Sequence, residues 1–146
     1  MRQVLVVMAT ALLAAVFGGT AVADSVYHTE HLELSGVGGA PGGGMVVNIH
    51  PNGPNVYAHE IYTLQHAVPG TYQVFLNLFP TSLNCTGPTT ALPTASITTN
   101  AIGNGRADVK FTPEDAAAIR GMTFSISWTV AGPATYVTAC TVVTLD

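Results

Sequence analysis

Polar and apolar residues alternate without exception from residue 122 to residue 130. The apolar positions are Met122, Phe124, Ile126, Trp128 and Val130, and the four positions between them are serines or threonines. Successive side chains of a β-strand point to opposite faces, so a period of two predicts a strand with one buried and one solvated face. Burial of such a side chain contributes about 1.5–3 kcal/mol, whereas ordering the backbone costs about 1–2 kcal/mol per residue. The strand therefore needs partners.

Similar segments elsewhere, bounded by turn residues, predict seven further strands. They cover residues 26–34, 45–50, 56–64, 71–79, 95–99, 106–111 and 135–144. Residues 100–105, rich in asparagine and glycine, predict a hairpin between the strands at 95–99 and 106–111. Thr112-Pro113-Glu114-Asp115 has the cap, proline and carboxylates of a helix start, and Gly121 ends a short helical turn. The pattern predicts an all-β fold, an antiparallel β-sandwich of about 7–8 strands with one short helical turn.

The first 23 residues have the three parts of a secretory signal peptide. Arg2 precedes an apolar stretch at 4–17, and Ala21-Val22-Ala23 is a small-x-small cleavage site. An uncleaved membrane anchor is the alternative, but Gly18, Gly19 and Thr20 interrupt the run of about 20 apolar residues that a spanning helix needs. Cleavage after Ala23 leaves residues 24–146, which suits a single domain. We expect a protein that is secreted or held in the cell envelope, without stable membrane insertion after cleavage.

Charge and cysteine content narrow the possible partners and the compartment. The chain has 4 lysines and arginines against 8 aspartates and glutamates, a net charge of −4 with neutral histidines. So few cations argue against binding to nucleic acid or to an anionic membrane surface. Cys85 and Cys140 are the two cysteines, and in an oxidising compartment a disulfide is favoured over two buried free thiols. Closing a loop of about 55 residues would stabilise the fold by roughly 4 kcal/mol.

The strand pattern of residues 24–146 resembles the immunoglobulin-like sandwiches. Two markers of a true immunoglobulin domain are missing, because Trp128 lies far after Cys85 and Thr138 replaces the tyrosine expected two residues before Cys140. Residues 136–146, Tyr-Val-Thr-Ala-Cys-Thr-Val-Val-Thr-Leu-Asp, are similar to the ends of small exported bacterial proteins of unknown activity. The resemblance implies a sandwich and brings no function with it.

All five histidines lie between residues 28 and 66, and together with Glu30, Glu33 or Glu60 they suggest a copper or zinc site. His28 and His31 are three apart on a strand and so face opposite ways. If Asn55 pairs with His50, His59 lies about four residues, roughly 13 Å, along the ladder. A metal site would need ligands from non-neighbouring strands, with His28, His50, His59 and His66 as candidates. Solvated histidines are favoured, and no cofactor is predicted.

No motif predicts a catalytic residue. Ser125 and Ser127 lie on the solvated face of a strand, and the nucleophile elbow Gly-x-Ser-x-Gly is missing from the sequence. The glycine-rich segment at 36–44 lacks the lysine and hydroxyl residue that end a phosphate-binding loop. A hydrolytic enzyme is therefore only a third hypothesis, supported by the general frequency of hydrolases among proteins and by no residue of this sequence.

Phe75 and Phe79 are the candidate binding residues. They share the face of the strand at 71–79 that Gln73 and Asn77 mark as solvated. Either a loop covers the two rings, which is favoured, or they form an apolar patch for a protein or a sugar ring. The sequence thus predicts an exported, non-catalytic domain that binds an unidentified protein or glycan at the cell surface or outside the cell. A histidine-based metal-binding protein is the alternative.

Overall fold

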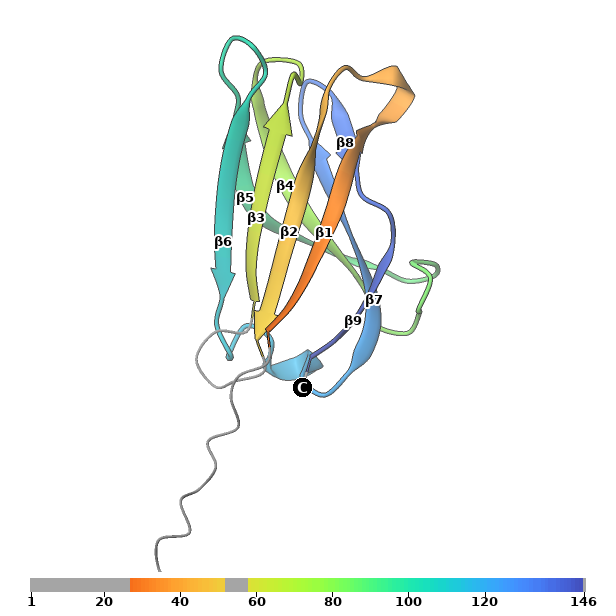
Figure 1. Ribbon diagram of the computed structural model, residues 1–146. Coiled ribbons are helices and arrows are strands. Elements are labelled where there is room, and N and C mark those ends of the chain that lie inside the picture. The colour runs from red at the N-terminus through yellow and green to blue at the C-terminus, as the bar shows by residue number, and fades with distance from the viewer. Residues whose placement is uncertain (1–26, 52–57, 146) are drawn as a thin grey trace, which may run out of the picture.

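Antiparallel strands account for most of the computed structural model, which describes residues 27–51 and 58–145 (Figure 1). The strands of the described part are β1 Tyr27–Gly36, β2 Gly43–Pro51, β3 Ala58–Gln65, β4 Thr71–Phe79, β5 Thr90–Thr98, β6 Gly105–Phe111, β7 Thr123–Ala131, β8 Thr135–Val137 and β9 Thr141–Thr144. Two short 3-10 turns, η1 Val37–Gly39 and η2 Ala117–Ile119, accompany them. The all-β prediction is confirmed, and the strand expected at 135–144 is divided into β8 and β9. The predicted signal peptide lies outside the described residues.

These strands form one sheet that curls into a nearly closed barrel, so the prediction of an immunoglobulin-like, two-sheet sandwich is wrong. The strand order is β5-β4-β7-β8-β1-β2-β3-β6, and β9 also pairs with β7. The short strand β8 makes the difference, because it pairs with β7 on one side and with β1 on the other. It thereby joins two groups of strands that a sandwich would keep in separate sheets.

The barrel has a seam between β5 and β6, which are the two edge strands of the sheet. The hairpin predicted for these segments is wrong, because β5 pairs with β4 and β6 pairs with β3. The chain between them only crosses from one edge to the other. Gly103 in this connection has φ +79°, and a Cβ there would lie 1.9 Å from the carbonyl oxygen of Ala67. Only glycine fits that position.

Inward side chains of the strands form the core. The largest fully buried ones are Trp128, Tyr62, Tyr72, Tyr136 and Phe124. On β7 the predicted apolar face is buried from Phe124 to Val130, whereas Met122, just before the strand, is exposed. Ser125 on the opposite face is also buried, because the loop after β4 covers it. Its hydroxyl donates to the carbonyl of Ser82 at 2.9 Å and accepts from the backbone N–H of Cys85 at 2.9 Å.

The predicted disulfide between Cys85 and Cys140 is confirmed. It ties the loop after β4 to the segment between β8 and β9, where the edge of β7 passes from one partner strand to the other. In that segment Thr138 accepts from the backbone N–H of Trp128 through Oγ1 at 3.0 Å and donates its own N–H to the carbonyl of Trp128 at 3.1 Å. The disulfide indicates an oxidising compartment outside the cytoplasm. Among the described residues, none belongs to a helix long and apolar enough to span a bilayer.

A short helical turn follows β6, as predicted, and lies across one end of the barrel (Figure 1). Its N-cap is Ala116 rather than the predicted Thr112. Thr112 and Asp115 instead form a separate turn just before it, in which the N–H of Thr112 donates to Oδ2 of Asp115 at 2.7 Å and the N–H of Asp115 donates to Oγ1 of Thr112 at 3.4 Å. The helical turn ends at Ile119, and Gly121, two residues later, has φ +74°. It covers the end of the barrel at which β2, β6 and β9 finish.

Candidate ligand-binding site

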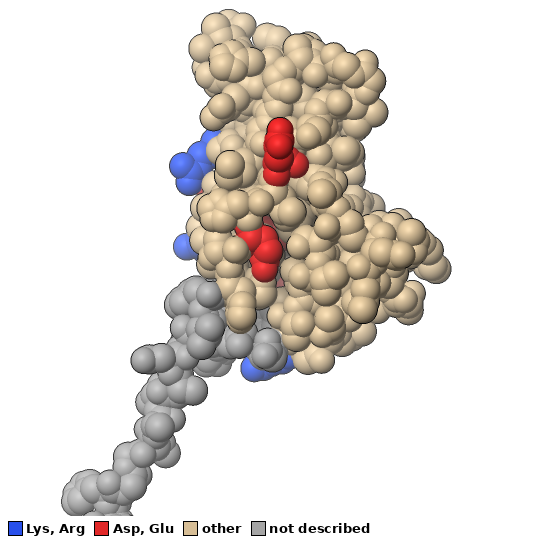
Figure 2. Space-filling view, turned by 45° about the vertical axis from the view of Figure 1, so that its right-hand side comes forward, with Lys and Arg blue, Asp and Glu red and all other residues tan. Residues whose placement is uncertain are grey.

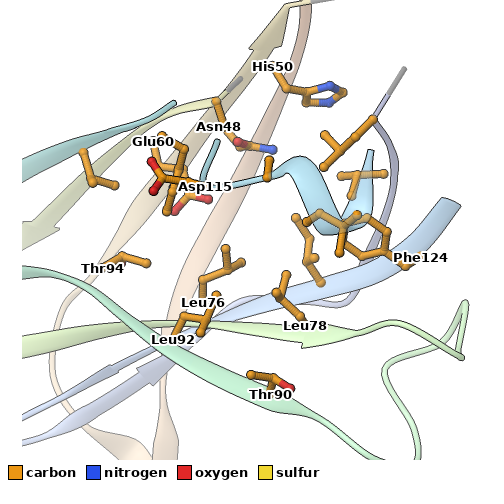
Figure 3. A pocket seen from close by; sticks show the side chains of 18 of the residues that line it. Asn48, His50, Glu60, Leu76, Leu78, Thr90, Leu92, Thr94, Asp115 and Phe124 are labelled. Carbon is orange, nitrogen blue, oxygen red and sulfur yellow. The ribbon is translucent and has the colours of Figure 1, made fainter. Parts of the chain in front are cut away.

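A cavity of about 670 Å³, partly open to solvent, lies inside the barrel next to this helical turn. Its walls come from β2 to β7, β9 and the helical turn and are mainly apolar, with Leu76, Leu78, Leu92, Val109, Phe111 and Phe124 among the lining residues. Figure 3 shows Asn48, Glu60 and His50 on one side and Leu76, Leu78 and Leu92 on the opposite side. Pockets for small ligands commonly have about 300–1,000 Å³ and combine apolar walls with a few polar groups.

Three polar residues on neighbouring strands form a row at one side of the barrel; Asn48 and Glu60 line the cavity, and Glu30 contacts Asn48. The register pairs Glu30 of β1 with Asn48 of β2, and Asn48 with Glu60 of β3. Cross-strand partners share a face of the sheet, and neighbouring strands are about 4.8 Å apart. The Nδ2 group of Asn48 donates to Oε2 of Glu30 at 3.0 Å, and Nε2 of His50 lies 2.8 Å from Oε1 of the same carboxylate. The carboxylates of Glu30 and Glu60 therefore lie at the same position along the strands, on either side of Asn48.

Glu60 is the more deeply buried of the two, with 2% of its surface exposed. Trp128 Nε1 donates to its Oε2 atom at 2.8 Å, and the hydroxyl of Tyr62 donates to the same oxygen. Its other oxygen, Oε1, has no hydrogen-bond partner among the described residues. Burial raises the pKa of Glu60 to about 7, against the smaller lowering effect of the hydrogen bonds from Tyr62 and Trp128. The carboxyl group is therefore divided between its neutral and charged forms near neutral pH.

Tyr62 links this carboxyl group to β5 across the seam. Its hydroxyl lies 2.9 Å from Oγ1 of Thr94. The pairing of β4 with β5 shifts by one residue between Val74 and Phe75, and Thr94 is the extra residue of this β-bulge. Burial, followed by the charge of Glu60, raises the pKa of Tyr62 well above its ordinary value, so the phenol keeps its proton.

Asn48 supplies a second acceptor that the protein leaves unused. It is 4% exposed, and its Oδ1 atom is fully buried and has no hydrogen-bond partner among the described residues. An unsatisfied buried polar atom costs about 1–3 kcal/mol and is rare in native proteins. Oδ1 of Asn48 and Oε1 of Glu60 together give the cavity a polar side suited to a hydrogen-bond donor.

The structure brings two of the four candidate metal-binding histidines together. His28 and His50 are cross-strand partners whose ring centroids lie 5.2 Å apart in a stacked arrangement. His59 lies on the outer face, with Nε2 at 3.2 Å from Oδ2 of Asp108, and His66 is exposed in the turn after β3. Within residues 27–51 and 58–145, no three side chains of the metal-binding types are placed to hold an ion. Metal binding remains only a prediction.

The expected offset between His50 and His59 is wrong. The observed register pairs Ile49 with His59, so the two histidines are close along the ladder. They still cannot share a ligand, because neighbouring positions on a ladder point to opposite faces of the sheet. His50 points into the barrel, where it is buried, and His59 points out.

Phe75 and Phe79 lie on the outer face of β4, opposite Thr129 and Ser125 of β7. Phe79 is 9% exposed and Phe75 is half-buried. The loop after β4 turns back at this point, where the N–H of Ser82 donates to the carbonyl of Phe79 at 3.2 Å. A binding role for these two residues stays a prediction.

The sequence suggests Glu30 and Glu60 only as metal ligands and does not single out Asn48. One signal for their position was available. Glu60, Tyr62 and Leu64 alternate along β3, and all three are buried. The carboxylate of Glu60 thus occupies the face that the aromatic and aliphatic residues mark as inward.

Comparison with known proteins does not assign the chain to a family. It matches no protein-family model, no curated protein and no solved structure. Function is therefore inferred from the chemistry of the cavity.

Proposed function

We propose that this protein is an exported, non-catalytic binding protein that holds one small, largely apolar molecule in the cavity of its barrel. The observation that carries the proposal is the cavity itself, about 670 Å³ with mainly apolar walls. The interior of an eight-stranded barrel is either filled by its own side chains or holds one small ligand. Here the part of the interior next to the helical turn holds a cavity.

Two further features support this function. The Cys85–Cys140 disulfide and the predicted signal peptide fit an exported protein. The protein or glycan partner expected from the sequence remains a prediction, but a concave, partly open and mainly apolar cavity favours a smaller ligand.

Titration with N-phenyl-1-naphthylamine, a neutral dye that becomes fluorescent in apolar surroundings, tests the proposal. We expect saturable binding of about one dye per chain. Val109→Phe combined with Leu78→Phe would fill part of the cavity, because both side chains line it. We expect this variant to weaken dye binding by at least about tenfold, since rings would occupy the space of the dye.

A matched control adds the same two rings outside the cavity. Leu83 and Val142 are 60% and 47% exposed and do not line the cavity. Leu83→Phe combined with Val142→Phe should bind the dye like the unmodified protein. Non-saturable binding, or equal binding by both double variants when circular dichroism shows that both are folded, would overturn the proposed function.

A further inference from the structure

The polar side of the cavity specifies the chemistry of the ligand more closely than the apolar walls do, and this inference rests on the proposed function. Glu60 and Asn48 are cross-strand partners, and each has one oxygen without a hydrogen-bond partner in the described chain. Carboxylate and amide oxygens accept hydrogen bonds. The ligand group that satisfies both must therefore be a donor with at least two hydrogens.

Charge distinguishes among such donors. The side-chain hydrogen bonds to Glu60 come from the neutral groups of Tyr62 and Trp128, and no ion pair joins its carboxylate to a cation of the described chain. Lys110 also lines the cavity, but it is exposed. The second carboxylate, Glu30, stands next to Asn48 in the same row. Figure 2 shows a face of the molecule on which acidic side chains lie near the middle and basic ones near the edge. Both the site and this face favour a cation over an anion.

Removing a carboxylate from water is costly unless the charge is paired and hydrogen-bonded. In the ligand-free protein the charged carboxylate of Glu60 therefore lowers the free energy of unfolding. A glutamine in its place would accept the same two hydrogen bonds from Tyr62 and Trp128 without the charge. The presence of a glutamate at position 60 is explained if a cationic ligand enters the cavity and pairs with its charge. A primary ammonium group has three donors and one positive charge, which matches both unused oxygens.

We infer that the ligand is a protonated primary amine with a hydrocarbon body, its ammonium group held between Glu60 and Asn48 and its body against the apolar wall. The hydrogen bond from a cation to a carboxylate is about twice as strong as one between neutral groups. An alcohol of the same length would use the same wall but lack the charge. A carboxylate of the same length would be repelled by both glutamates.

Isothermal titration with octylamine, octan-1-ol and octanoate at pH 7 tests this inference on the unmodified protein. We expect octylamine to bind at least about tenfold more tightly than octan-1-ol, and octanoate to bind more weakly than the alcohol. The fluorescence of Trp128, the only tryptophan of the chain, should change with octylamine, because its indole donates to Glu60.

Proton release is a second readout that a purely structural role of Glu60 would not produce. With its pKa near 7, pairing with ammonium should release about half a proton per amine bound at pH 7, measurable in buffers of different ionisation enthalpy. The other titratable side chains that line the cavity are His50, Lys110 and Asp115, with Glu30 and Tyr62 in contact with its polar residues. The proton release measured with octan-1-ol gives the contribution of these other groups, because the alcohol carries no charge to pair with Glu60.

Glu60→Gln should abolish both the preference for octylamine over octan-1-ol and the proton release. Glu33→Gln is the matched control, since Glu33 is exposed on β1 and does not line the cavity. Equal affinities for octylamine and octan-1-ol in the unmodified protein would overturn the amine inference and leave the proposed function standing. Failure of the dye and of all three octyl compounds to bind would overturn both.

Discussion

Replacing Glu60 by glutamine should make the protein more stable at neutral pH. The pKa of Glu60 is about 7 in the folded protein, compared with 4.5 for an ordinary glutamate. Each pKa unit corresponds to about 1.4 kcal/mol, so the difference amounts to about 3 kcal/mol. Well below pH 4.5 the carboxyl of Glu60 is protonated in both the folded and the unfolded protein, and the full contribution of about 3 kcal/mol to the free energy of unfolding is present. Between about pH 4.5 and 7 the unfolded chain loses its proton first, so the free energy of unfolding falls as pH rises.

Urea unfolding followed by circular dichroism from about pH 4 to pH 8 measures this effect. The glutamine variant should lack that decline and be more stable than the unmodified protein by about 3 kcal/mol at pH 8, because the amide oxygen still accepts from Trp128 and Tyr62 without carrying a charge. Glu33→Gln should retain the decline. If the unmodified protein and the Glu60→Gln variant have the same pH dependence, Glu60 is not a desolvated carboxyl group and the reasoning fails.

Three other variants test separate parts of the structure. Cys85→Ser combined with Cys140→Ser should lower the free energy of unfolding by about 4 kcal/mol in urea titrations, because the bridge closes a loop of 55 residues; a loss below about 1 kcal/mol would contradict this. Trp128→Phe removes a donor to Glu60, so the pKa of Glu60 should rise further and the pH-dependent decline should extend to higher pH. We expect the free energy of unfolding to fall by about 2 kcal/mol. An unchanged pH dependence would argue against the hydrogen bond from Trp128 to Glu60. His59→Ala should lower the free energy of unfolding by less than about 1 kcal/mol, because its contact with Asp108 lies on the outer face; a larger loss would show that the contact is structural.

The strands could be predicted from the sequence because their signal is local. Phe124, Ile126, Trp128 and Val130 point inward whether the sheet closes into a barrel or packs on a second sheet. The alternation therefore carries no information about closure. Closure depends on β8, three residues long, pairing on both sides. The hairpin prediction failed for the same reason, since the turn between β5 and β6 does not determine which strands pair.

The cavity could not be predicted, because its chemistry depends on contacts between distant parts of the chain. Trp128 and Glu60 are 68 residues apart in sequence and meet only across the interior. The partner of Tyr62, Thr94, depends on a β-bulge that the alternation of β5 does not reveal. Histidine content drew attention to a metal site, whereas the residue that combines burial with a perturbed pKa is a glutamate.

The most direct test of ligand binding in the barrel is a crystal structure of the protein soaked in octylamine. We predict electron density for one amine inside the cavity, with its nitrogen within hydrogen-bond distance of Oε1 of Glu60 and its chain against Leu76 and Leu78. Side chains that fill this space, or an empty cavity at an amine concentration that saturates the titration, would contradict the account.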